Sequence, residues 1–155
     1  MIVACDINYG IGKNNKLPAW NIKGDLRRFK EITIGDGNNV IIMGRKTYES
    51  LPNFPLKERI NIVVSKSLKP CDDVPNIAKS IEDAYNMALG FVKENNGEIW
   101  LIGGASLYDE CIMKNYVKYV DITKVESVYN CDTYLGENSI KWLTQNEEKV
   151  NYRIL

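Results

Sequence analysis

The side chain best placed to do chemistry in this sequence is an aspartate at the start of an expected helix. The pattern predicts a helix that begins near Gly24 and carries Asp25 on its apolar face. The other members of that face are Leu26, Phe29 and Ile32. A carboxylate on such a face needs a partner, because an unpaired buried charge is costly. Since Trp20 lies five residues upstream, the carboxylate could lie in an aromatic-lined cleft and accept two parallel N–H bonds from an amidine-like group.

A simpler interpretation of Asp25 remains open at this point. Acidic residues are favoured in the first turn of a helix by the helix dipole, and Arg28, three residues on, could pair with Asp25. The rest of the composition narrows the choice, because the 155 residues include no histidine. Histidine is the commonest general base and metal ligand, and every Ser–His or Cys–His nucleophile requires it. Acid–base chemistry therefore falls to other side chains, and no metal site is predicted.

Composition excludes several further classes of protein. Lys+Arg and Asp+Glu both number 20, so the basic excess typical of nucleic-acid binders is missing. No apolar run is long enough to span a bilayer, and the N-terminal residues do not resemble a signal peptide. The four cysteines are far apart and form no CxxC pair, which indicates reduced thiols in a cytoplasmic protein. We expect no repeats and no linker, and therefore a single domain over residues 1–155 that binds neither nucleic acid nor membrane.

The elements that position Asp25 are expected to form an α/β fold. Apolar runs at residues 1–6, 39–43, 60–65, 98–102 and 119–125 are typical of strands buried on both faces. Residues 80–95 predict the clearest helix, capped by Ser80 with Asp83 three residues on. Its stripe consists of Ile81, Ala84, Tyr85, Ala88, Leu89 and Val92. Strands that alternate with helices predict a largely parallel sheet. Residues 142–155 predict two short strands in an antiparallel hairpin.

Two strand–glycine–helix junctions are candidate anion sites. One follows residues 39–43 with Gly44, Arg45, Lys46 and Thr47, and the other follows residues 98–102 with Gly103–Gly104. In an open parallel sheet, ligands bind beyond the carboxyl ends of strands, where helix N-termini offer free N–H groups. Ser65 and Lys66 end another strand, and a cation there favours a phosphorylated ribose. Each junction can also be a plain tight turn, and Lys66 a solvated loop lysine.

Taken together, these motifs resemble dihydrofolate reductase over nearly the whole chain. The matching segments, in the family's order, are residues 2–12, 18–30, 40–51, 55–61, 102–108, 121–123 and 132–133. The resemblance implies a mixed, mostly parallel central sheet flanked by helices, with an antiparallel C-terminal strand. It also implies NADPH-dependent reduction of dihydrofolate to tetrahydrofolate, which supplies one-carbon and thymidylate metabolism. NADPH would be the cofactor, antifolates would bind, and the chain would act as a monomer.

The resemblance also implies the roles of individual residues. Asp25, Trp20 and Thr123 would be catalytic, with Asp25 holding the pterin's amino group and N3, and Thr123 linked to it directly or through water. Arg59 would bind the substrate's α-carboxylate. The other implied substrate-binding residues are Ile2, Val3, Leu26, Phe29, Leu51, Leu56, Ile102 and Tyr108. The implied cofactor-binding residues are Ala4, Ile11, Gly12, Gly44, Arg45, Lys46, Thr47, Ser65, Lys66, Ile102, Gly103, Gly104, Ala105, Ser106, Leu107 and Tyr108.

The sequence departs from the family at identifiable places. Pro18-Ala19-Trp20 carries one extra residue where the family has Pro-Trp, and the chain after Asp132 is short, so the last hairpin is expected to be trimmed. Two rivals remain: a reductase of the same fold that acts on a pyrimidine amino sugar in riboflavin synthesis, and a non-catalytic nucleotide-binding module. The first needs neither Asp25 nor Arg59, and in the second Asp25 is only a capping charge.

Overall fold

Parallel strands form the framework of the protein in the computed structural model, which describes residues 1–20, 22 and 24–155. One group has the order β1 (Ile2–Asp6), β7 (Val120–Val125), β9 (Val150–Ile154). The other has the order β5 (Ile77–Ala78), β4 (Ile60–Val64), β3 (Val40–Gly44), β6 (Ile99–Gly103). Strands β1 and β6 lie next to each other, so the two groups meet there. An antiparallel pair, β2 (Gly10–Gly12) with β8 (Thr133–Tyr134), stands apart.

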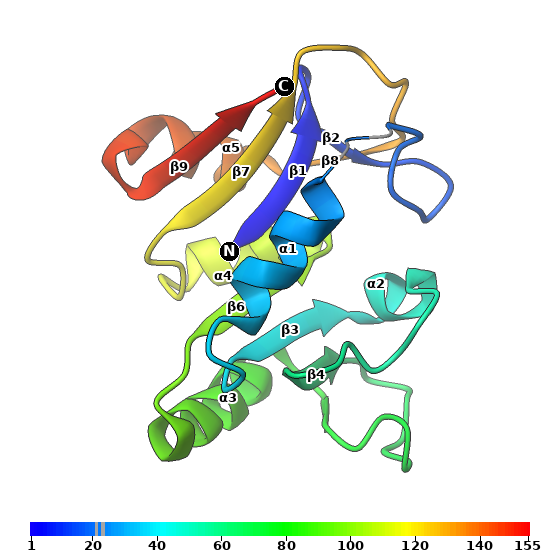
Figure 1. Ribbon diagram of the computed structural model, residues 1–155, viewed down its shortest axis with the longest axis vertical. Helices are drawn as coiled ribbons and strands as arrows, with labels where there is room; N and C mark the ends of the chain where they lie inside the picture. Colours follow the sequence, from blue (N-terminus) through cyan, green and yellow to red (C-terminus); the bar gives the residue numbers. More distant parts are fainter. Residues whose placement is uncertain (21, 23) are drawn as a thin grey trace.

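Helices cover both faces of this framework (Figure 1). They are α1 (Asp25–Ile34), α2 (Arg45–Ser50), α3 (Ile81–Asn95), α4 (Ala105–Met113) and α5 (Glu137–Gln145), with a short 3₁₀ turn, η1 (Glu147–Lys149). The alternation of side chains along β7 separates the faces. Ile122 belongs to the core cluster that includes residues of α4 and α5, whereas Asp121 and Thr123 bond to α1.

The strands predicted from apolar runs are confirmed, and so is the predicted helix at residues 80–95. Ile41, Ile42 and Met43 in β3 are at most 2% exposed, as expected for a strand covered on both faces. The Ser80 side chain accepts the Asp83 backbone N–H at 3.0 Å and caps α3. Only part of the α3 stripe is buried, because Leu89 is 41% exposed. No helix among the described residues has the length and apolar character needed to cross a membrane.

The C-terminal prediction is wrong, although the mixed, mostly parallel sheet is confirmed. Residues 142–145 belong to helix α5, and β9 pairs with β7 in parallel rather than antiparallel register. The physical reason is a helix anchor distant in sequence: the Asp109 carboxylate on α4 accepts the Ser139 backbone N–H at 2.8 Å and its hydroxyl at 3.0 Å. A helical crossover between two strands returns the chain in the same direction, which makes the pair parallel.

Candidate active site

Asp25 is the first residue of α1 and faces strands β7 and β9. Its N-cap, Gly24, has φ 85°, a left-handed conformation that favours glycine. The Thr123 hydroxyl donates to Asp25 Oδ1 at 2.9 Å, so the expected link between these residues is confirmed as a direct hydrogen bond. The Asp25 side chain is 20% exposed, and Arg153 Nη1 lies 3.8 Å from the same oxygen. The carboxylate is therefore held from the side of the sheet.

Arg28 does not supply the partner that the simpler interpretation gave to Asp25. Its guanidinium makes two hydrogen bonds to the Asp121 carboxylate, one from Nη2 at 2.7 Å. These bonds raise the pKa of Arg28, and their effect exceeds that of desolvation, which lowers it. Asn151 on β9 also donates to Asp121 Oδ2 at 2.9 Å. This network fastens the first turns of α1 to β7 and β9 and thereby fixes the place of Asp25.

Most residues expected to wall the substrate gather in one partly buried apolar cluster. Phe29, Leu51, Leu56 and Ile102 all pack against a core that includes the buried Ile2. Leu26 differs, because it is 71% exposed and contributes nothing to the core. Phe29 follows Asp25 by about one helical turn, so the cluster starts on the same side of α1 as the carboxylate. It offers there the apolar surface that an aromatic ring system requires.

Arg59 lies on the segment before β4 and reaches the last turn of α1, whose first residue is Asp25. Its Nη1 donates to the Thr33 hydroxyl at 3.1 Å, and its Nε donates to the Lys57 carbonyl at 2.9 Å. Partial burial lowers the pKa of the guanidinium, against the opposing charge of Glu58. These two bonds use only part of the five-donor fork, so Arg59 keeps donors for an anionic group.

The two glycine junctions are brought together because β3 and β6 are neighbours. Met43 is paired with Gly103, and a side-chain carbon added to Gly44 would lie 3.7 Å from the Gly103 carbonyl oxygen. The Gly103–Gly104 peptide is cis, and Gly103 has φ 134°. No side chain caps α4, so its first N–H groups remain available to a ligand. The hydroxyl of Thr47 would lie 3.1 Å from a side-chain carbon on Gly103, which places this donor at the same point.

The cationic residues expected to hold phosphate lie along this edge. Arg45 donates to Glu49 Oε1 at 2.8 Å and to the Ser67 hydroxyl at 2.8 Å, which links α2 to the loop after β4. Ser65 is buried, and its hydroxyl oxygen accepts the Leu68 backbone N–H at 3.1 Å. The hydroxyl proton of Ser65 is therefore free to be donated elsewhere. Lys46 and Lys66 are both exposed.

Tyr108 connects the two halves of the site. It is 3% exposed, and burial raises its pKa, so the hydroxyl remains protonated and donates to the Ile2 carbonyl at 2.8 Å. The same hydroxyl would lie 3.5 Å from a side-chain carbon on Gly103. This bond links α4 and the glycine pair to β1, in which Val3 and Ala4 directly follow Ile2.

The loop between β2 and α1 brings Trp20 to another loop rather than to the sheet. Its ring packs edge-on against Tyr129, with ring centroids 5.4 Å apart. The Tyr129 backbone N–H in turn donates to the buried Asp6 at 3.1 Å. Ile11 and Gly12 lie on β2 beside this loop. Asn21 and Lys23, which belong to the segment 18–30 of the resemblance, lie outside the described residues.

Sequence reasoning missed Asp6, Tyr129 and Arg153. Asp6 ends the first strand and ties β1 to two loops, since its Oδ1 accepts the Gly10 backbone N–H at 2.8 Å. An aspartate at the end of an apolar strand was the available signal. The position of Arg153 depends on the pairing of β9 with β7, which sequence patterns do not reveal.

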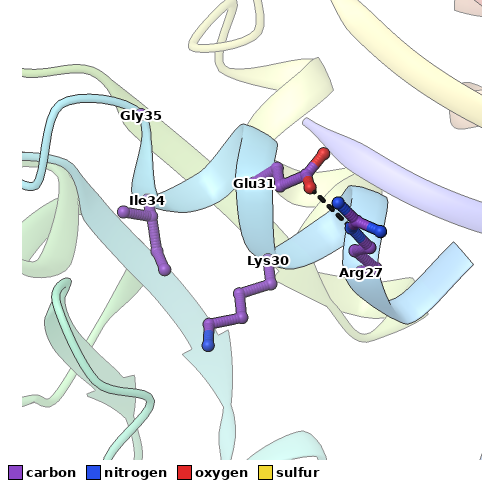
Figure 2. A pocket seen from close by; sticks show the side chains of 5 residues that line it. All are labelled: Arg27, Lys30, Glu31, Ile34 and Gly35. Atoms are coloured by element: carbon purple, nitrogen blue, oxygen red, sulfur yellow. Dashed lines mark hydrogen bonds and ion pairs between the residues drawn. The ribbon is translucent and has the colours of Figure 1, made fainter. Parts of the chain in front are cut away.

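A surface depression along α1 is separate from these groups. Figure 2 shows it between Arg27, Lys30, Glu31, Ile34 and Gly35, with Arg27 Nε bonded to Glu31 at 2.9 Å. At about 100° per residue, Arg27, Lys30, Glu31 and Ile34 project from the side of α1 opposite Asp25. The ion pair in the depression, Arg27 with Glu31, is exposed and joins two residues of α1 itself. The depression therefore does not contribute to the arrangement around Asp25.

Comparison with known proteins adds a family to this geometry. The family model described as dihydrofolate reductase matches residues 1–153. The chain is similar to "Dihydrofolate reductase" of Schistosoma mansoni, with 38% identity over 144 residues that cover 86% of this chain and 75% of the relative. It is similar to "Dihydrofolate reductase" of Sus scrofa, with 36% identity over 144 residues that cover 88% of this chain and 77% of the relative.

A longer relative matches at the same level. "Bifunctional dihydrofolate reductase-thymidylate synthase" of Paramecium tetraurelia is 36% identical over 159 residues, which cover 98% of this chain. The match covers 32% of that relative, so the chain spans about a third of its length. The relatives from Sus scrofa and Schistosoma mansoni are matched over about three quarters of their length.

Proposed function

Because the chain belongs to the dihydrofolate reductase family, we propose that it reduces dihydrofolate to tetrahydrofolate with NADPH. The observation that carries this proposal is the arrangement of Asp25. A partly buried carboxylate is fixed from the sheet by Thr123 at 2.9 Å and lies one helical turn before Phe29, a member of the apolar cluster. A carboxylate with two oxygens can accept a pair of parallel N–H bonds, which matches the amino group and N3 of a pterin.

The residues around Asp25 would hold the substrate in the order that its structure requires. Asp25 binds the pterin edge, and Phe29, Leu51 and Leu56 pack against the ring and the aminobenzoyl group that follows. Arg59, whose fork is only partly used within the protein, binds the α-carboxylate at the other end. An apolar wall between an anionic anchor and a cationic one fits a flat molecule with an amidine-like head and an acidic tail.

The two glycine junctions fit the cofactor. Gly44 lies against Gly103 and Gly104, so backbone N–H groups and the Thr47 hydroxyl converge where no side chain fills the space. The open N-terminus of α4, at Ala105, Ser106 and Leu107, suits a diphosphate. Exposed Lys46 and Lys66 supply positive charge for a 2′-phosphate, with Arg45 tied to the same loop. NADPH, when bound there, supplies the hydride that is transferred from nicotinamide C4 to pterin C6.

The protein's own contribution to the reaction is position and electrostatics. Asp25 holds the edge of the ring that is remote from N5, so it does not hand a proton to N5 directly. It stabilises the protonated pterin, and water delivers the proton. Tyr108 fixes the Ile2 carbonyl at 2.8 Å, which sets the β1 backbone beside the ring. Trp20, packed on Tyr129, closes the side of the site nearest β2.

The setting of this activity is part of the same proposal. All four cysteines are free thiols, which suits a reducing compartment such as the cytoplasm. We expect the chain to act as a monomer formed by one domain over residues 1–155 and to bind antifolates through Asp25.

The direct test is the loss of NADPH absorbance when dihydrofolate is added to the purified protein. The proposal expects turnover with dihydrofolate and none with a pyrimidine amino sugar. Turnover with the sugar alone would identify the rival reductase. Absence of turnover with either substrate, from a protein that binds NADPH, would leave the non-catalytic nucleotide-binding module. Either of the last two results would reject the proposed function.

A further inference from the structure

The C-terminal strand places a cation beside the candidate catalytic carboxylate. Arg153 Nη1 lies 3.8 Å from Asp25 Oδ1, and the two side chains are 32% and 20% exposed. The parallel register of β7 and β9 pairs Thr123 with Arg153, so the hydroxyl and the guanidinium project on the same face of the sheet. Both therefore approach Asp25 from the side of the sheet, and both are directed at the same oxygen, Oδ1.

A neighbouring ion pair explains why Arg153 faces Asp25 rather than Asp121. Asp121 is already bonded by Arg28 and by Asn151. Among the described residues, the charged groups joined in these two ion pairs are Asp25 and Arg28 on α1, Asp121 on β7 and Arg153 on β9. Helix α1 contributes one cation and one anion to this face, and the strands contribute one of each. Within the described part of the chain, these four charges balance one another.

The distance between Arg153 and Asp25 indicates what the guanidinium can do. A separation of 3.8 Å is too long for a hydrogen bond, so Arg153 does not occupy an acceptor position that a ligand needs. Its charge still acts on the carboxylate, because both side chains are mostly shielded from water. A cation at this place repels a second cation that arrives at the same carboxylate.

We propose that Arg153 is a positioning residue whose charge, 3.8 Å from Asp25 Oδ1, biases the site toward a neutral pterin over a cationic ring. The inference rests on the proposed function for the identity of the neutral ligand, which is dihydrofolate or folate. The cationic ligand is a diaminopteridine that carries a proton on its ring. The two ligands share a shape and differ in charge, so their relative affinity reports the field of Arg153.

The test compares three variants with the unmodified protein. Arg153→Met removes the charge, Arg153→Lys keeps it, and Arg27→Met removes an 83% exposed cation from the opposite side of α1. Binding of folate and of a diaminopteridine is followed by tryptophan fluorescence without NADPH. In Arg153→Met we expect the affinity for the diaminopteridine to rise about three- to tenfold relative to folate. Arg153→Lys and Arg27→Met are expected to keep the original ratio.

The Arg153→Lys variant separates charge from simple packing, because it changes the shape of the side chain and keeps its charge. If Arg153→Met keeps the original affinity ratio, the role assigned to Arg153 is wrong. Where Arg153→Met does not fold, Arg153→Gln makes the same charge change.

The same samples distinguish this inference from the proposed function. NADPH oxidation by the unmodified protein on adding dihydrofolate tests the proposed function alone. A protein without turnover whose binding ratio changes in Arg153→Met refutes the function and supports the role of Arg153. An active protein whose ratio is equal in Arg153→Met and Arg27→Met refutes the role of Arg153 and keeps the function.

Discussion

The buried carboxylate of Asp6 should be a pH-dependent anchor for the loops around Trp20. Asp6 is 1% exposed, and it accepts backbone N–H bonds from Asn8 at 2.9 Å, Gly10 at 2.8 Å and Tyr129 at 3.1 Å. Burial by itself raises the pKa of this carboxyl, but the hydrogen bonds together outweigh burial, and the pKa is lowered. We therefore expect the ionised form to stabilise the folded protein.

The substitution Asp6→Asn allows the size of this effect to be worked out. In Asp6→Asn the side-chain amide oxygen can still accept the backbone N–H groups of Asn8 and Gly10. Its NH₂ group, however, would face the Tyr129 N–H, and two donors cannot form a hydrogen bond. One buried donor is left unsatisfied, at about 1–3 kcal/mol, and the two remaining bonds lose their charge assistance. The free energy of unfolding should fall by about 2–4 kcal/mol near pH 7. Turnover should fall too, because Tyr129 supports Trp20.

The sign of the pH dependence follows from the lowered pKa. A carboxyl whose pKa is lower in the folded state contributes stability above its unfolded value, and this contribution is lost as pH falls through the folded value. The difference between Asp6→Asn and the unmodified protein should therefore shrink below about pH 4. Urea unfolding from about pH 7 to about pH 3 measures it.

Asp109→Asn is the matched control for this experiment. Asp109 also has a lowered pKa, because its hydrogen bonds to Asn138 and Ser139 outweigh burial, but it anchors α5 rather than the Trp20 loop. It should lose stability with the same pH dependence and keep its turnover. An Asp6→Asn protein that unfolds within about 0.5 kcal/mol of the original near pH 7, or whose deficit persists unchanged into acid, would refute the reasoning.

Three further predictions concern the cofactor edge and the framework. Lys66→Ala should weaken NADPH binding far more than NADH binding; equal losses in a titration of both would remove Lys66 from the 2′-phosphate site. Tyr108→Phe leaves a buried β1 carbonyl without its donor and should lower the free energy of unfolding by about 1–2 kcal/mol in urea; no change would show that the bond is not needed. A side-chain carbon on Gly97 would collide with the Asn38 backbone, whereas one on Gly90 meets nothing within 4 Å. Gly97→Ala should therefore fail to fold, and Gly90→Ala, inside helix α3, should gain about 0.5–1 kcal/mol; similar thermal unfolding of the two variants would contradict this.

The framework was predictable where local pattern and final environment agree. The run at residues 39–43 is apolar throughout because β3 is covered on both faces, and its central residues are at most 2% exposed. Helix α3 carries its own start signal, since Ser80 caps it through Asp83. In both cases the information lies within a few neighbouring residues. Reasoning from short segments was therefore sufficient.

The C-terminal region was not predictable in the same way. Trp142 and Leu143 before Val150 resemble two short strands when only the local pattern is considered. The decisive contact is the Asp109 carboxylate with Ser139, thirty residues apart, and no local signal reports it. Because the expected antiparallel hairpin was wrong, Arg153 was not predicted near Asp25. Its approach to Asp25 depends on the parallel pairing of β9 with β7.

The features of the site also differ in whether local sequence patterns could predict them. The helix position of Asp25 followed from periodicity, but its bond to Thr123 came from the resemblance, since 98 residues separate the two. The adjacency of Gly44 and Gly103 required the pairing of β3 with β6. Leu26 was expected on a buried stripe and is exposed instead, because that end of α1 extends beyond the core cluster, whose α1 members are Phe29 and Ile32.

The most direct test of the central claim is the steady-state reduction of dihydrofolate by Asp25→Asn. The exposed Asp36→Asn serves as the matched control, because Asp36 lies in the turn after α1. We predict that kcat/KM falls about a hundredfold or more in Asp25→Asn, that diaminopteridine binding is lost with it, and that Asp36→Asn retains both. A folded Asp25→Asn protein that reduces dihydrofolate within a few-fold of the original rate would contradict the assignment of Asp25 as the pterin anchor.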